Sequence, residues 1–308
     1  MKRRDLLKFL SFIPGGIFTE KLFAEQISNE SKVSKKKVLT VAHITDVHII
    51  ESNNAPVRFK NILQQIVTKH KPDFFLNTGD SISDATRDHV TRERVIQQWS
   101  LWDDCLKVIS GHEVYSCLGN HDIWHKAPSV NDDMFWERYA VKKLNMPARY
   151  YSFNKNNWDF IVLDGNNRDG TYSLDEEQFD WLRKKLEDFP ASSNVLVMSH
   201  YPVVGTTYQI CGGSGMADDW KKQKDLFYKH RDKVKICLSG HQHLADKTFY
   251  NGVQFCCNGA VCGRWWGKGN NESAGIGYNR ETPPGYAILK LYANGTAENE
   301  YYPHEFNE

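Results

Sequence analysis

The chain has 308 residues, of which 40% are hydrophobic, and its 39 basic residues nearly balance its 38 acidic ones, giving a net charge of +1. This length allows one large α/β domain or two modest ones. The near-neutral charge provides no basic field, so nucleic acid is not expected as a partner. The seven cysteines include no CxxC pair, and an odd number cannot all pair internally, which favours buried thiols.

The N-terminus has the features of an export signal. A basic start is followed by an apolar run through Phe18, and Ala24 fits the last position before a cleavage site. The run is too short for a stable membrane anchor. The pair Arg3-Arg4 resembles a twin-arginine signal, with an ordinary secretory signal or an uncleaved N-terminal helix as alternatives. We therefore expect an export signal at 1–24, a solvated linker at 25–37, and a periplasmic or extracellular location. Contact with a membrane is expected only through an uncleaved signal.

From residue 38 onward, short apolar runs alternate with amphipathic stretches. The first part predicts strands at 38–45, 74–77 and 113–118, and helices at 57–70 and 88–109. The middle predicts strands at 149–153, 159–163, 194–198 and 235–238, and helices at 174–186 and 220–230. The end predicts strands at 247–250, 254–257, 286–291 and 298–302, with hairpin turns at Asn251-Gly252 and Asn294-Gly295. This order indicates two packed sheets with helices outside, in one domain spanning 38–308.

Five of the predicted strands are followed by polar residues of the types that bind metal ions. They lie in Thr45-Asp46-Val47-His48, Thr78-Gly79-Asp80, Gly119-Asn120-His121-Asp122, Ser199-His200 and Gly240-His241-Gln242-His243. Each segment alone is more often a turn or a satisfied histidine. Ligand sites, however, gather at the carboxyl ends of strands, and so many unpaired acids and histidines are costly unless a cation holds them. Carboxylate, amide and imidazole donors without a thiolate suit Mn, Fe, Zn or Co.

As an ordered set, these five segments resemble the motifs of the calcineurin-like metallophosphoesterases over about residues 40 to 245. The resemblance implies a four-layer α/β/β/α sandwich of two mixed sheets. It implies the following ligands for a first metal ion: Asp46, His48, Asp80 and His243. It implies that Asp80 also bridges to a second ion, whose site is completed by Asn120, His200 and His241. Asp84 fits a second acid that is common in this loop of the family.

Two such cations would lower the pKa of a shared water and clamp the phosphoryl oxygens, so that a metal-bridging hydroxide attacks phosphorus in line. The resemblance implies that His121 protonates the leaving oxygen as general acid and that Asp122 orients it by a hydrogen bond. Alternatively, His121 only binds phosphate. We expect a metal-dependent phosphoric ester hydrolase acting on a small phosphoester, with phosphodiesters slightly favoured over phosphomonoesters. The alternative is a catalytically inactive metal-binding or scaffold protein of the same fold, against which the complete ligand set argues.

Candidate substrate contacts follow the metal-binding segments. The glycine-rich stretch 259–267 contains Arg264, Trp265 and Trp266. Two adjacent tryptophans in such a loop are rarely both buried, so they could stack on a base or sugar with Arg264 near a phosphate. The alternative is a lid that packs on the core. His125, shortly after the Asn-His-Asp turn, is a further candidate contact.

Overall fold

The computed structural model describes residues 36–86, 89–210, 215–269 and 280–304. The expected export signal at 1–24 lies outside these residues, as does the expected linker except for Lys36 and Lys37. Within the described residues, none of the helices has the length and apolar character needed to cross a bilayer. The export signal therefore stays a prediction.

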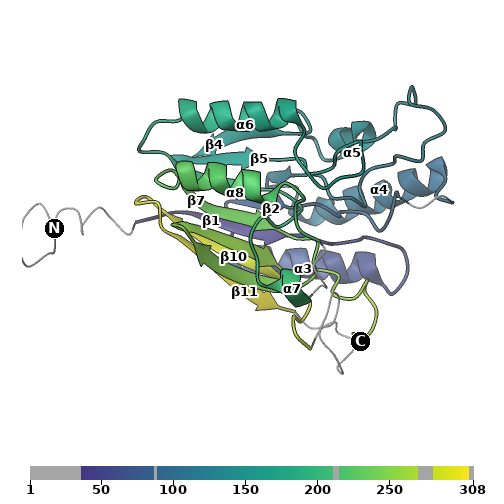
Figure 1. Cartoon of the computed structure of the whole chain (residues 1–308). Coiled ribbons are helices and arrows are strands. Elements are labelled where there is room, and N and C mark those ends of the chain that lie inside the picture. The colour runs from purple at the N-terminus through teal and green to yellow at the C-terminus, as the bar shows by residue number, and fades with distance from the viewer. Residues whose placement is uncertain (1–35, 87–88, 211–214, 270–279, 305–308) are drawn as a thin grey trace, which may run out of the picture.

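The first of two mixed sheets has the strand order β11-β10-β1-β2-β3 (Figure 1). Its strands are β1 (Lys37–Ile44), β2 (Phe74–Asn77), β3 (Val114–Ser116), β10 (Gly285–Tyr292) and β11 (Ala297–Pro303). β1, β2 and β3 run parallel, whereas β10 pairs antiparallel with both β1 and β11. The C-terminal hairpin thus extends a sheet that the N-terminal strand begins.

The second sheet has the order β4-β5-β6-β7-β9-β8. Its strands are β4 (Tyr151–Lys155), β5 (Trp158–Val162), β6 (Asn194–Met198), β7 (Val234–Ser239), β8 (Ala245–Tyr250) and β9 (Val253–Asn258). The four central strands are parallel, and the edge strands β4 and β8 pair antiparallel. The predicted turn between β8 and β9 is present, with positive φ at Asn251 (52°) and Gly252 (85°), as a tight hairpin turn requires.

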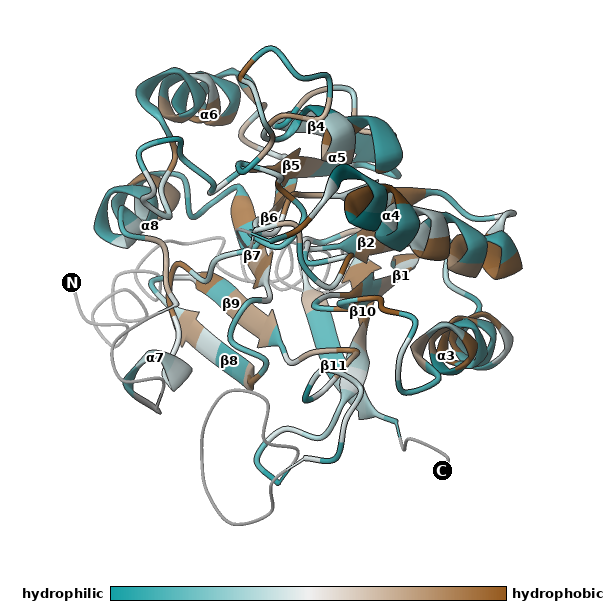
Figure 2. Cartoon of the chain, turned by 90° about the vertical axis from the view of Figure 1, so that its right-hand side faces the viewer, coloured by the Kyte–Doolittle hydropathy of each residue, from teal (hydrophilic) through white to brown (hydrophobic). Residues whose placement is uncertain are grey.

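Helices cover the outer face of each sheet (Figure 2). On the first sheet lie α3 (Ala55–His70) and α4 (Arg92–Leu106), which a 3₁₀ turn (Lys107–Ile109) continues. On the second lie α6 (Glu176–Asp188) and α8 (Trp220–Lys229). The predicted four-layer α/β/β/α sandwich is therefore confirmed. The short helices α5 (Arg138–Lys143) and α7 (Thr207–Ile210) were not expected, because fewer than two turns leave no readable periodicity.

Two helices begin later than the sequence predicts, and capping explains both shifts. α4 begins at Arg92 because the side chain of Thr91 accepts a hydrogen bond from Arg94 N at 3.3 Å. α6 begins at Glu176 because Asp175 Oδ1 accepts from Gln178 N at 2.9 Å. Apolar periodicity extends past these caps and cannot locate them.

Strand β6 shows how the layers are held together, because its side chains alternate between two apolar clusters. Leu196 and Met198 face the core between the sheets, while Val195 and Val197 pack in the cluster with α6 and α8. A strand covered on both faces reads as a continuous apolar run, as this one does. Between the sheets, Phe160 of β5 meets Phe74 of β2 edge to face, with ring centroids 5.5 Å apart.

Replacing Phe160 by alanine is expected to lower the free energy of unfolding by about 3–5 kcal/mol, because the fully buried ring leaves a cavity between the sheets. The matched control is Phe249→Ala on edge strand β8, where the ring is 73% exposed. It should change stability by less than about 0.5 kcal/mol. Urea denaturation measures both. Equal losses for the two variants would contradict this account of the core.

Candidate metal centre

The predicted ligands come together at the carboxyl ends of five strands from both sheets. Asp46 and His48 follow β1, Asp80 follows β2, and Asn120 follows β3. His200 follows β6, and His241 and His243 follow β7. The backbone is left-handed, with φ between 44° and 70°, at Asp46, His48, Asp80, His241 and His243. Such conformations are uncommon outside glycine and cluster at functional sites. This concentration marks the centre independently of its side chains.

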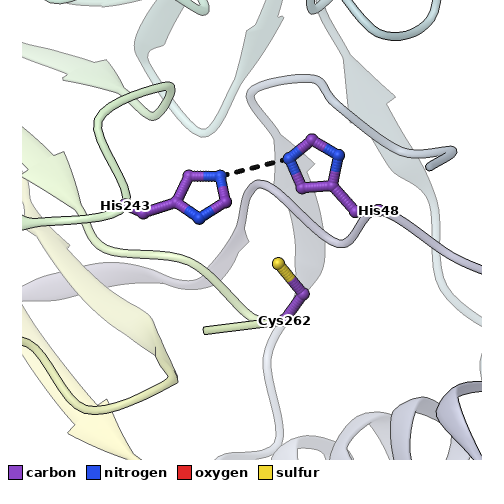
Figure 3. A group of neighbouring side chains, drawn as sticks. All are labelled: His48, His243 and Cys262. Carbon is purple, nitrogen blue, oxygen red and sulfur yellow. Dashed lines mark hydrogen bonds between the residues drawn. The ribbon is translucent and has the colours of Figure 1, made fainter. Parts of the chain in front are cut away.

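One half of the centre is formed by two imidazoles that face each other (Figure 3). His48 Nε2 lies 3.1 Å from His243 Nε2, which in turn lies 3.3 Å from Asp46 Oδ1. In the other half, His200 Nε2 lies 3.1 Å from both His241 Nδ1 and Asn120 Oδ1. The structure thus brings together, in two groups, the residues that the family resemblance assigns to a first and a second ion.

Asp80 joins the two halves. Its Oδ2 lies 3.4 Å from His48 Nε2 and 3.2 Å from His200 Nε2. Its other oxygen, Oδ1, accepts a hydrogen bond from the backbone of His121 at 2.8 Å. One oxygen therefore faces both halves, which is the placement expected of a bridging carboxylate, while the other fixes the rotamer.

Backbone carbonyls orient the imidazoles. The Nδ1 of His200 bonds Thr78 O at 2.8 Å, and the Nδ1 of His243 bonds Gly263 O at 2.9 Å. A ring nitrogen that donates to a carbonyl leaves the opposite nitrogen as a lone-pair donor toward the centre. Asp46 is held by hydrogen-bond donors instead. Its Oδ2 accepts from Thr45 Oγ1 at 2.6 Å and from His241 N at 3.0 Å.

The electrostatics favour ionised carboxylates at this buried position. Burial raises the pKa of Asp46, but the charge and hydrogen bond of His243 together with the charge of His200 outweigh burial and hold the pKa at about 2. Burial lowers the pKa of His241 to about 3. Among the described residues, neither Asp46 nor Asp80 forms an ion pair with a lysine or arginine. Carboxylate, imidazole and amide donors without a fixed counter-ion fit divalent cations of the Mn, Fe, Zn or Co kind.

Two glycines allow the strand ends to approach each other closely. A Cβ on Gly240 would lie 1.9 Å from Thr45 Oγ1 and 2.3 Å from Asp46 Oδ2. A Cβ on Gly119 would lie 2.1 Å from Asp80 Oδ1. The carboxylates of Asp46 and Asp80 thus occupy space that only glycine leaves open.

The expected hydrogen bond from the His121 ring to the Asp122 carboxylate is not present, since His121 Nδ1 bonds Ser83 O instead. The carboxylate of Asp122 instead accepts from the backbone N–H groups of Ser81, Ile82 and Gly119 at 2.8, 3.3 and 2.9 Å. Burial, followed by the charge of Asp80, raises the pKa of Asp122 to about 7. Asp122 therefore braces the two loops that carry Asp80 and Asn120, and the expectation that it orients His121 is wrong.

His121 is oriented by other groups. Its Nδ1 bonds Ser83 O at 2.9 Å and lies 3.6 Å from Asp84 Oδ1. Its ring also lies among the ligands, since one nitrogen is within 4.8 Å of the donor atoms of both His48 and Asp80. Sequence reasoning missed the role of Ser83, because a backbone carbonyl leaves no signature in the residue type.

Cys262 was also missed. Its buried thiol points toward the gap between His48 and His243, and the three donor atoms lie within 4.8 Å of one another (Figure 3). Its thiol was not among the predicted donors, because no second cysteine stands at metal-binding spacing from Cys262. The structure therefore adds a thiol beside the first site.

The predicted substrate contacts differ in whether a substrate could reach them. Trp265 is 38% exposed, and its ring centroid lies 3.8 Å from that of His48. Trp266 is 1% exposed and its Nε1 donates to Val47 O at 2.7 Å, so it anchors the loop and cannot stack on a substrate as expected. Arg264 is exposed on the same loop, and His125 lines a cavity beside Asn120.

Comparison with known proteins agrees with this geometry. The family model described as calcineurin-like phosphoesterase matches residues 39–245. A 3′,5′-cyclic-nucleotide phosphodiesterase from Nostoc sp. is 24% identical over 275 residues, covering 86% of this chain and 92% of the relative. "Probable glycerophosphodiester phosphodiesterase GpdQ" from Arcobacter nitrofigilis is 23% identical, covering 70% and 76%. A dimetal phosphatase from Danio rerio shares the fold, with a TM-score of 0.61 at 16% identity over 87% of this chain and 100% of that one.

Gly240→Ala is expected to abolish binding of at least one metal ion, because the new methyl group displaces Asp46 or Thr45. Gly111→Ala is the matched control, since a Cβ there meets nothing within 4 Å. Metal content after dialysis, measured by plasma mass spectrometry, should fall in the first variant only, with circular dichroism confirming that both fold. Full metal content in folded Gly240→Ala would contradict the assignment.

Proposed function

Because the chain belongs to the calcineurin-like phosphoesterase family, we propose that it hydrolyses a small phosphodiester at a centre of two metal ions. The observation that carries this proposal is the placement of Asp80. A single oxygen of its carboxylate, Oδ2, lies 3.4 Å from His48 Nε2 and 3.2 Å from His200 Nε2. Asp46, His48, Asp80 and His243 would hold the first ion. Asp80 with Asn120, His200 and His241 would hold the second.

Two divalent cations bound there would supply an activated water as nucleophile and would neutralise charge on the phosphoryl oxygens. The proposed ions are Mn, Fe, Zn or Co, in accord with the oxygen and nitrogen donors. The protein's own contribution is to hold these donors rigidly. The backbone bonds to Asp80, His200 and His243 fix the rings and carboxylates before a substrate arrives.

We propose His121 as the general acid for the leaving oxygen. Its Nδ1 donates to Ser83 O at 2.9 Å, so Nε2 is the nitrogen that exchanges a proton with the substrate. The side chain is mostly buried yet has 18% of its surface exposed, so a bound ester can reach it. Asp84 Oδ1 lies 3.6 Å from the same Nδ1 and helps to orient the ring.

The preference for diesters over monoesters is part of the proposal. Support comes from the names of the two relatives, both of which are phosphodiesterases. Trp265 is proposed to contact the ester from the side of His48, with Arg264 and His125 as further contacts.

We also propose export through residues 1–24 by the twin-arginine route. Retention of the protein in the cytoplasm after Arg3→Lys and Arg4→Lys would support that route, and unchanged export would contradict it.

The hydrolase is tested on the full chain loaded with Mn, Fe, Zn or Co in turn. Bis-p-nitrophenyl phosphate is expected to turn over faster than p-nitrophenyl phosphate, and His200→Ala should abolish both activities because it removes a ligand that also contacts Asp80. Full metal occupancy without turnover of any phosphoester would contradict the proposal. That result would favour the alternative function, a catalytically inactive metal-binding or scaffold protein of the same fold.

The acid role of His121 makes a separate prediction. His121→Ala should lower kcat by about 10²–10⁴-fold for a diester with an alkyl leaving group. The loss should be much smaller for bis-p-nitrophenyl phosphate, because p-nitrophenolate leaves without protonation. Exposed His89→Ala is the control and should change neither rate. An equal loss on both substrates, with metal content unchanged, would show that His121 only binds phosphate.

A further inference from the structure

A cavity of about 420 Å³ opens beside the second metal site. It is lined by Asn120, a proposed ligand of that ion, and by aromatic side chains from two loops, Trp136 and Tyr172. We propose that this cavity binds the planar base of a nucleotide ester, with Trp136 and Tyr172 as its aromatic walls. This inference rests on the proposed phosphoesterase function and adds the class of substrate. A second cavity, of about 480 Å³ near β3 and β4, shares none of its lining residues with the centre.

The Tyr172 wall lies beside the metal centre and is not part of it. Its ring stacks on buried Tyr201, with centroids 4.4 Å apart and planes 16° from parallel, and lies 5.7 Å from the ring of His241. Asp218 fixes both backbone polar groups of Tyr172. Tyr172 N donates to Asp218 Oδ2 at 2.6 Å, and Tyr172 O accepts from Asp218 N at 2.8 Å. The ring is nevertheless 38% exposed. A rigid aromatic ring with an open face next to a metal ligand is suited to stacking on a bound base.

The Trp136 wall is held in a strained conformation. Its backbone has a φ of 59°, which is uncommon for a large side chain and is maintained by surrounding contacts. Two hydrogen bonds to Trp124, at 3.1 and 3.3 Å, pair the backbones of the two tryptophans. The ring lies 5.7 Å from that of His125. This backbone pairing thus fixes the turn that places Trp136 and His125 against the cavity.

The remaining lining favours a neutral heterocycle over an additional charged group. The cavity is lined by one guanidinium, Arg168, and one carboxylate, Asp169, so their charges balance. The carboxylate is engaged by the hydroxyl and backbone N–H of Thr171 at 2.6 and 2.8 Å. The amide side chains of Asn166 and Asn167 add polar groups, although Asn166 already accepts from Tyr201 Oη. Aromatic walls with a few polar groups and this volume are typical of sites for nucleoside-sized ligands.

Binding by the metal-loaded full chain tests the inference, using adenosine monophosphate, ribose 5-phosphate and inorganic phosphate in calorimetry. The first two ligands carry the same phosphate and sugar, so their affinity ratio reports the base alone. We expect the base to tighten binding about tenfold. Tyr172→Ala should make the affinities for adenosine monophosphate and ribose 5-phosphate about equal, while leaving the affinity for inorganic phosphate unchanged. Tyr172→Phe should keep the ratio, and so should the matched control Tyr228→Ala, whose ring is 46% exposed on α8.

The possible outcomes separate this inference from the function on which it rests. Equal affinities for adenosine monophosphate and ribose 5-phosphate, with inorganic phosphate still bound, would overturn the base site and leave the phosphoesterase proposal standing. Phenyl phosphate binding as tightly as adenosine monophosphate would also overturn it, because the cavity would then select any ring. Failure of inorganic phosphate to bind the metal-loaded protein would overturn both. Trp136→Leu provides a second variant and should likewise lower the ratio.

Discussion

The structure depends on bringing the Asp80 carboxylate between histidines that belong to different sheets. Asp46 and Asp80 are both buried and repel each other, and the basic side chains closest to them are imidazoles that follow β1, β6 and β7. Neither sheet alone contains a complete ligand set, so the centre exists only when the sheets pack face to face. The apolar core that includes Phe74 and Phe160 therefore also sets the distance between the ligands.

Regular and irregular parts of the chain have different roles around this centre. The ligands are held by strand ends and backbone carbonyls, and close contacts such as those at Gly119 and Gly240 leave the ligand side chains little conformational freedom. Loops of less regular form carry Trp265 on one side and Tyr172 on the other. A fold that fixes ligands by strand geometry and leaves the walls to loops can keep one chemistry while its substrates vary.

Much of the framework could be predicted from the sequence. The strands Phe74–Asn77 and Asn194–Met198 were predicted to the residue, because a short apolar run ends at a polar turn in each case. The strand-end pattern also predicted the candidate ligands, and the structure brings these residues together. Asp122 was assigned a contact that it does not make, since its partners are backbone N–H groups in a neighbouring loop. Cys262, Tyr172 and Trp136 were missed because their positions depend on loop conformations without any sequence period.

The pairing of β1 with β10 has a consequence for when the centre forms. β1 lies between β2 and β10, so the strand that delivers Asp46 and His48 is completed on one side by residues near the C-terminus. Pairing between strands so far apart in the sequence is slow, because a long stretch of chain must first close into a loop. The strand that delivers two proposed ligands is therefore fully paired only once segments far apart in the chain have come together.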